Sequence, residues 1–150
     1  MEKAVRAILT RFIRSDHAIP LISFSIYVGS LLIPGMYSHG YNGNRPIYGY
    51  DILVSGAAGI INGNFAWFAN IIYFGALLLL VEKRGKYISQ ILLVAAIFFG
   101  LTSFSIVGVS TFNEGGSSRV YILGPGFLVW LFSFVILLAY LVIKVIWTQE

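Results

Sequence analysis

The chain has 150 residues, of which 58% are hydrophobic, 11% are charged and none is cysteine. A soluble domain carries about 25% charged residues, whereas the apolar residues here form blocks of about twenty, the length of a helix that crosses a bilayer. Composition therefore excludes an ordinary soluble domain, and the lack of cysteine excludes disulfides, thiolate nucleophiles and cysteine-ligated metals.

The N-terminal arm, residues 1–15, has the spacing of a basic amphipathic helix. Val5, Ile8, Leu9 and Phe12 follow the i, i+3, i+4, i+7 pattern, so they share one helical face. Basic side chains lie on the rest of the surface, and such a helix lies along a membrane with anionic headgroups. It serves either as a surface anchor or as the docking site of a cytosolic partner.

Four apolar runs follow, and they predict an all-α, integral membrane four-helix bundle. Gly124-Pro125-Gly126 has the composition of a turn that starts the fourth helix, with proline at or near its first position. The predicted membrane helices cover residues 18–37, 52–81, 87–110 and 121–146.

The distribution of Lys and Arg predicts how these helices are oriented. The N-terminal arm holds four, loop 82–86 holds three and the C-terminal end holds one, whereas loops 38–51 and 111–120 hold one each. By the positive-inside rule, both termini and loop 82–86 are cytoplasmic in a multi-pass inner-membrane protein. We expect no direct contact with nucleic acid. Seven basic residues are instead expected to contact anionic headgroups or a cytosolic partner: Lys3, Arg6, Arg11, Arg14, Lys83, Arg84 and Lys86.

The second apolar run is too long for a single upright span. A helix over 52–81 would be about 45 Å long, against a hydrocarbon core of about 30 Å. The run is therefore either one extended helix or a helix broken near its glycines, with residues 52–62 lying at the interface. In the broken form Asn62 lies at headgroup level, and Asn70 lies about 12 Å deeper and needs a hydrogen-bond partner.

If the helix is unbroken, its small and polar residues form one stripe, opposite bulky residues such as Trp67 and Ile71 that suit a lipid environment. Small residues let membrane helices approach closely, and amides join them by hydrogen bonds. The stripe is therefore a helix-packing surface, within the bundle or between protomers, or it lines a solute path through Asn62, Asn70 and Tyr73. Its members are Ser55, Gly59, Asn62, Ala66, Asn70 and Tyr73.

The first outer loop, 38–51, is rich in Tyr, Gly and Asn, which recognition loops favour. The alternative is an aromatic belt at the membrane interface. Both alternatives stay open for the candidate recognition residues His39, Tyr41, Arg45, Tyr48 and Tyr50.

No catalytic set is recognisable in the sequence. No charged residue lies in the middle of a predicted span, although proton relays and ion-coupled transport usually need one. Candidate nucleophilic serines exist at Ser103, Ser105 and Ser133, but no histidine is predicted near them to act as a base. His17 and His39 are predicted on opposite sides of the membrane, so they cannot share a metal ion. We therefore expect a protein without enzymatic activity, cofactor or metal.

The segment G-x-x-N-G-N-F-A-W-F-A-N (59–70), preceded by G-Y-D-I-L (49–53), resembles a family of small, uncharacterised bacterial four-helix inner-membrane proteins. In that family a G-x-F-A-W-x-A-N segment opens the second helix, and the family implies no function. In layout alone, the chain is similar to the four-helix membrane subunits of phage-defence systems such as Kiwa, which work with a cytosolic partner. The residues that carry the match are Gly63, Phe65, Ala66, Trp67, Ala69 and Asn70.

Three functions stay open at this stage. The first is a non-enzymatic, homo-oligomeric subunit that acts as a membrane sensor or anchor for a cytosolic partner, as in antiviral defence. The second is a channel or facilitator for a small or uncharged solute. The third is an immunity protein against a membrane-acting toxin.

Overall fold

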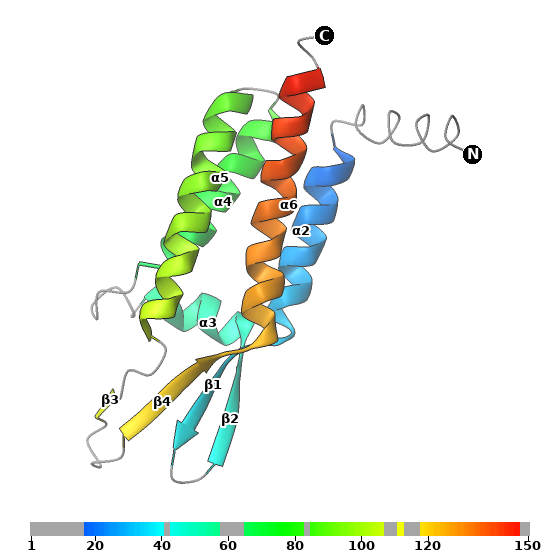
Figure 1. Ribbon diagram of the computed structural model, residues 1–150. Helices are drawn as coiled ribbons and strands as arrows, with labels where there is room; N and C mark the ends of the chain where they lie inside the picture. The colour runs from blue at the N-terminus through cyan, green and yellow to red at the C-terminus, as the bar shows by residue number, and fades with distance from the viewer. Residues whose placement is uncertain are drawn as a thin grey trace.

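The computed structural model describes residues 17–40, 43–57, 65–82, 85–106, 111–112 and 118–147. The chain is mostly helical, with a small sheet that extends from one end of the helices (Figure 1). The predicted amphipathic helix 1–15 lies outside the described residues.

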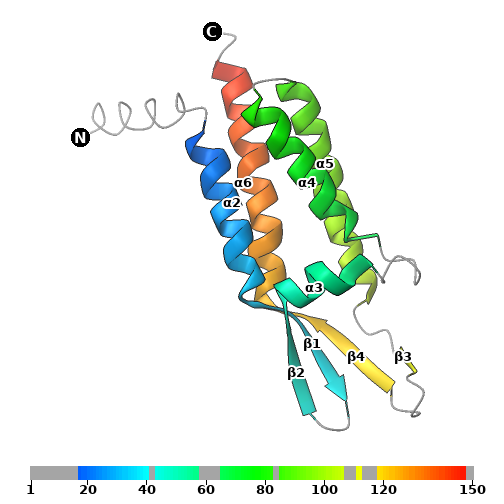
Figure 2. The ribbon, with the colours of Figure 1, turned by 180° about the vertical axis from the view of Figure 1, so that it is seen from behind.

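Four long helices run side by side as two antiparallel pairs. The helix α2 (Ala18–Leu31) packs against α6 (Pro125–Trp147), and α4 (Phe68–Val81) packs against α5 (Lys86–Leu101). A short 3-10 helix, η2 (Thr102–Ile106), continues α5, and α5 also contacts α6. The start of α2, the end of α6 and the α4–α5 connection therefore lie at one end of the bundle (Figures 1 and 2).

The helix boundaries follow proline and glycine. Helix α2 stops at Leu31, short of the predicted residue 37, because Pro34 cannot donate a backbone hydrogen bond and the chain turns into a strand. Helix α6 begins at Pro125, as the Gly-Pro-Gly turn predicts. Residues 121–123, predicted as part of this helix, belong to a strand instead.

A four-stranded antiparallel sheet occupies the segments that the sequence predicts as outer loops. Its order is β2 (Gly43–Tyr48), β1 (Pro34–Gly40), β4 (Ser118–Leu123) and β3 (Thr111–Phe112). In the centre of the sheet, β1 pairs with β4, with Tyr37 opposite Ile122. This pairing joins segments far apart in the chain, so no local pattern of residues reveals it.

The second apolar run contains two separate helices. Helix α3 (Gly49–Ser55) lies across the end of the bundle, at the base of the sheet, and α4 begins only at Phe68 (Figure 2). This arrangement corresponds to the broken form of the two alternatives; residues 58–64, including Gly59, Asn62 and Asn64, lie outside the described residues.

Aromatic side chains fill the space between the two helix pairs. Tyr27 of α2 stacks on Tyr73 of α4 with ring centroids 5.2 Å apart, and Tyr73 stacks on Phe134 of α6 at 4.6 Å. Small residues, Ala69, Ala76 and Ala96, are fully buried where helices approach closely. The core of the molecule is therefore this aromatic layer, continued by leucines toward the end of the bundle where α2 begins and α6 ends.

Candidate functional site

A group of hydroxyls joins three helices in the interior. Ser23 Oγ of α2 donates to the carbonyl oxygen of Ser133 on α6 at 2.8 Å and lies 2.7 Å from Tyr73 Oη on α4. Since the single Ser23 proton is used on the carbonyl, the Tyr73 hydroxyl is the donor in the second bond. All three side chains are fully buried, so these bonds hold α2, α4 and α6 in register.

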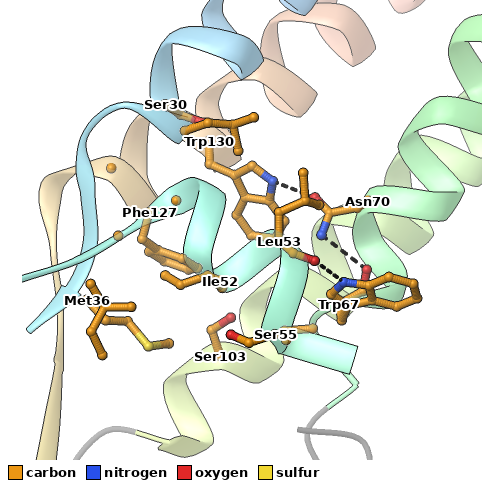
Figure 3. Close-up of a pocket in the computed structure, with 17 residues that line it drawn as sticks. Ser30, Met36, Ile52, Leu53, Ser55, Trp67, Asn70, Ser103, Phe127 and Trp130 are labelled. Carbon is orange, nitrogen blue, oxygen red and sulfur yellow. Dashed lines mark hydrogen bonds between the residues drawn. The ribbon is translucent and has the colours of Figure 1, made fainter. Parts of the chain in front are cut away.

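Asn70, one turn away on α4, is the second polar junction. Its Oδ1 accepts hydrogen bonds from Tyr27 Oη at 3.0 Å and from Trp130 Nε1 at 2.9 Å, and its Nδ2 donates to the Trp67 carbonyl oxygen at 3.2 Å. Figure 3 shows the bonds to Trp130 and Trp67. Tyr27 lies on α2 and Trp130 on α6. The carboxamide therefore joins three helices of one chain, which offsets the cost of burying it.

Trp67 attaches helix α3 to the start of α4. Its indole Nε1 donates to the Leu53 carbonyl oxygen at 2.8 Å (Figure 3). The Leu53 carbonyl lies in the last turn of α3, where backbone oxygens lack partners within the helix. The bond thus gives a carbonyl at the helix end a side-chain partner and holds α3 across the end of the bundle.

A cavity of about 330 Å³ lies under α3, where the helices meet the sheet (Figure 3). Its wall is contributed by nearly every element at this end of the molecule. None of the described lining residues carries a charge, and most are apolar. They are Ser30, Leu31, Gly35, Met36, Ile47, Gly49, Ile52, Leu53, Ser55, Gly56, Ala66, Trp67, Asn70, Ser103, Gly126, Phe127 and Trp130.

Ser103 differs from the other buried hydroxyls of the bundle. It lies on η2 at the cavity wall with only 4% of its surface exposed, and its hydroxyl has no hydrogen-bond partner within the described part of the chain. Ser23, Ser30, Ser89 and Ser133 are buried too, but each donates to a backbone carbonyl. Buried polar groups without a partner are rare and call for an explanation.

The predicted stripe of small and polar residues is divided by the fold. Asn70 and Tyr73 are buried in the interior, whereas Ser55 is an exposed residue at the end of α3. Ser55, Ala66 and Asn70 nevertheless all line the cavity. They meet because α3 folds back over the start of α4, and not because they share a face of one helix.

The predicted cytoplasmic docking residues fall mostly outside the described part, which includes Lys86 alone of that set. Lys86 is exposed at the start of α5, with its Nζ 5.9 Å from the centre of the Tyr87 ring. Lys3, Arg6, Arg11, Arg14, Lys83 and Arg84 lie outside the described residues.

The predicted recognition residues lie on the sheet and on α3. His39 is in β1, opposite Asn44 of β2, and Arg45 is an exposed residue of β2. The rings of Tyr48 and Tyr50 stack with centroids 5.8 Å apart, across the junction of β2 and α3. Tyr41 lies outside the described residues.

Several residues of this site carry no recognisable signal in the sequence. The sequence assigns Trp67 to a lipid-facing surface, yet it lines the cavity and binds α3. Trp130, Tyr27 and Ser23 look like ordinary residues of apolar runs. An indole or hydroxyl inside such a run indicates that a buried acceptor is needed, but not which one.

The site shows no metal-binding chemistry: within the described ranges, no group of three or more His, Asp or Glu residues lies close enough to hold an ion. Comparison with known protein families, characterised proteins and solved structures gives no match.

Proposed function

We propose that the protein is a non-enzymatic, homo-oligomeric subunit of a bacterial inner membrane that senses a signal on the outer side and serves a cytosolic partner. Its basic end would be cytoplasmic, and the sheet, α3 and the cavity would lie at the outer surface. The role would suit a membrane component of an antiviral defence system.

The apolar outer surface of the helices carries this proposal. Large apolar side chains point outward from all four helices, for example Leu21, Leu78, Ile91 and Leu128, each at least 63% exposed. The polar side chains of the helices, which include several serines and Asn70, are buried instead, next to the aromatic and leucine core. Soluble proteins rarely expose contiguous apolar patches beyond a few hundred Å², so this surface is suited to lipid.

Helix length gives further support. Two helices, Lys86–Phe104 and Pro125–Ile146, are long and apolar enough to cross a membrane. The core helix of a soluble protein is mostly buried, whereas only 28% and 39% of these two are buried. We propose that α2 and α4, which have 14 residues each, span the membrane with them, because both pack side by side with the longer helices.

The site at the sheet end supports a sensing role. The cavity, the stacked Tyr48–Tyr50 pair and the exposed Arg45 all lie at the end opposite the termini. A solute path has less support, because the Asn70 carboxamide oxygen and the Tyr73 hydroxyl are engaged in hydrogen bonds between helices. Within the described part of the chain, no observation favours the immunity role.

Site-directed labelling tests the orientation, since the chain has no native cysteine. Arg45→Cys is at the sheet end and Glu82→Cys at the opposite end, and both positions are exposed. In spheroplasts, a membrane-impermeant maleimide is expected to label Arg45→Cys at once and Glu82→Cys only after lysis. Equal labelling of both, or the reverse order, would contradict the proposed topology.

Co-purification tests the partner. Crosslinking in the native host, followed by affinity purification of the tagged chain, is expected to recover a cytosolic protein in fixed proportion. The comparison variant is Lys86→Glu, which places an acidic residue at the predicted cytoplasmic docking surface and is expected to recover less of the partner. Recovery of the protein as a monomer without any specific co-purifying protein would argue against a subunit role.

A further inference from the structure

We infer that the cavity under α3 is a binding site for a small, uncharged amphiphile with an apolar body and one hydroxyl or carbonyl group. The inference deepens the proposed function and rests on it only for the membrane setting; it identifies what would be sensed.

The first argument is the chemistry of the wall. Met36, Ile47, Ile52 and Phe127 supply apolar surface, and no described lining residue carries a charge. An ion without a paired charge is costly to bury in such surroundings. The volume of about 330 Å³ is at the lower end of the range for ligand pockets, roughly 300–1,000 Å³. A small neutral molecule with an apolar body fits both properties.

The second argument is the unused hydrogen-bonding capacity at the wall. The Ser103 hydroxyl is 4% exposed and has no partner among the described residues. Asn70 uses one N–H of its carboxamide on the Trp67 carbonyl, and its second N–H has no partner in the same part of the chain. A hydroxyl or carbonyl group of a ligand would satisfy such groups, which a purely apolar ligand leaves unpaired.

The third argument is how firmly the wall is held. Trp67 is fixed by its bond to Leu53, and Trp130 by its bond to Asn70 (Figure 3). Pre-organised walls reduce the ordering that a ligand must impose on binding. The two indoles also provide a reporter, because the only other tryptophan, Trp147, lies at the far end of α6.

The test uses the full chain in nanodiscs with Trp147→Phe, so that all indole emission arises at the cavity. The probe is terminally brominated octanol, whose bromine quenches a neighbouring indole. Saturable quenching is expected for the alcohol, and none for terminally brominated octanoate, whose carboxylate the uncharged wall excludes. Quenching that rises without saturation, as partition into the bilayer alone produces, would overturn the inference.

Two substitutions locate the binding. Ser103→Leu places a bulky apolar side chain at the cavity wall and is expected to abolish the saturable component. Ser103→Ala removes one hydrogen bond and is expected to weaken binding about three- to tenfold. The matched control is Ser89→Ala, a fully buried serine at the α4–α5 contact, away from the cavity; its affinity should equal that of the parent. If Ser103→Leu does not fold, Ser103→Ala against Ser89→Ala decides.

The outcome can be separated from that of the proposed function. Binding is measured on the purified chain without a partner, so a missing partner does not change it. Absence of saturable binding in the chain with an unaltered cavity, together with the expected maleimide labelling, would reject the ligand site alone. Equal affinity of Ser103→Ala and Ser89→Ala would also reject it.

Discussion

Asn70 shows how one polar residue organises an apolar chain. Its carbonyl oxygen accepts from an indole and a phenol on two different helices, and its amide nitrogen bonds its own helix start. Hydrogen bonds between membrane helices contribute about 0.6 kcal/mol each on average. The larger effect comes from losing the acceptor, because two buried donors are then left unpaired.

We predict that Asn70→Leu lowers the free energy of unfolding by about 1–3 kcal/mol, because the Tyr27 hydroxyl and the Trp130 indole lose their acceptor. The measurement is unfolding in mixed micelles, followed by circular dichroism. Gln90→Leu is the matched control: it makes the same chemical change on α5, where the Gln90 side chain has no hydrogen bond to other described residues. An equal loss of unfolding free energy in both variants would contradict a stabilising role of the Asn70 hydrogen bonds.

The hydrogen bond of Trp67 leads to a prediction about how firmly helix α3 is held. Trp67→Phe keeps an aromatic ring at the cavity but removes the donor to the Leu53 carbonyl. The amides of α3 should then exchange with deuterium about two- to tenfold faster, which corresponds to the loss of one neutral hydrogen bond. Trp130→Phe, which removes the bond to Asn70 instead, should leave α3 exchange unchanged. Unchanged exchange in Trp67→Phe would show that α3 is held by packing alone.

At the scale of elements, the junction of bundle and sheet depends on close backbone approach. The backbone of Gly124 donates to the Gly35 carbonyl at 2.8 Å, just before α6 begins. A Cβ at Gly124 would collide with the Pro34 carbonyl oxygen. Only glycine therefore lets the end of β4 cross the start of β1.

Gly124→Ala is expected to lower the free energy of unfolding by about 1–3 kcal/mol, the usual cost of overpacking. Gly29→Ala is the matched control, because nothing lies within 4 Å of a Cβ added there. It should leave stability unchanged or raise it by up to about 1 kcal/mol, since alanine favours the helix. The same detergent unfolding assay compares the two, and a neutral Gly124→Ala would show that the crossing tolerates a backbone shift.

The sheet is the part of the secondary structure that could not be predicted from the sequence. Tyr, Gly and Asn in 38–51 fit a recognition loop equally well. The strand β1 forms because β2 lies on one side and β4 on the other, and β4 follows it by more than seventy residues. Pairing of this kind depends on where the helix ends are held, and no local pattern encodes it.

At the scale of the whole molecule, most buried polar groups of the bundle are hydrogen-bonded within one chain; among the described residues, the Ser103 hydroxyl and the second N–H of Asn70 are not. Asn70, Tyr73 and Ser23 have hydrogen-bond partners on neighbouring helices of the same chain, and the Ser133 hydroxyl donates to the Trp130 carbonyl oxygen within α6. The outward faces of the four helices are apolar instead. Contacts between protomers would therefore use these outer faces rather than the stripe that contains Asn70.

Native mass spectrometry from nanodiscs tests this division. We expect a discrete oligomer for the wild type, and the same oligomer for folded Asn70→Leu, because the partners of Asn70 are intramolecular. Phe98→Asn, which places an amide on a strongly exposed outer face of α5, is the comparison variant and is expected to shift the distribution of masses. Loss of the oligomer in Asn70→Leu alone would assign Asn70 to a contact between protomers.

The sequence by itself determines that four apolar helices form, although it extends the first and the fourth into residues that belong to strands. Their apolar runs and the turn before Pro125 act locally, because helix propensity and length depend on neighbouring residues. It also marks Asn70 as an amide that needs a partner. The tertiary structure decides which partners these are, and it converts two predicted loops into a sheet. It also places Trp67, which follows the end of α3 by twelve residues, and Ser103, which follows Trp67 by thirty-six, around one cavity. These features arise from contacts between distant segments, which form only when the helices are packed.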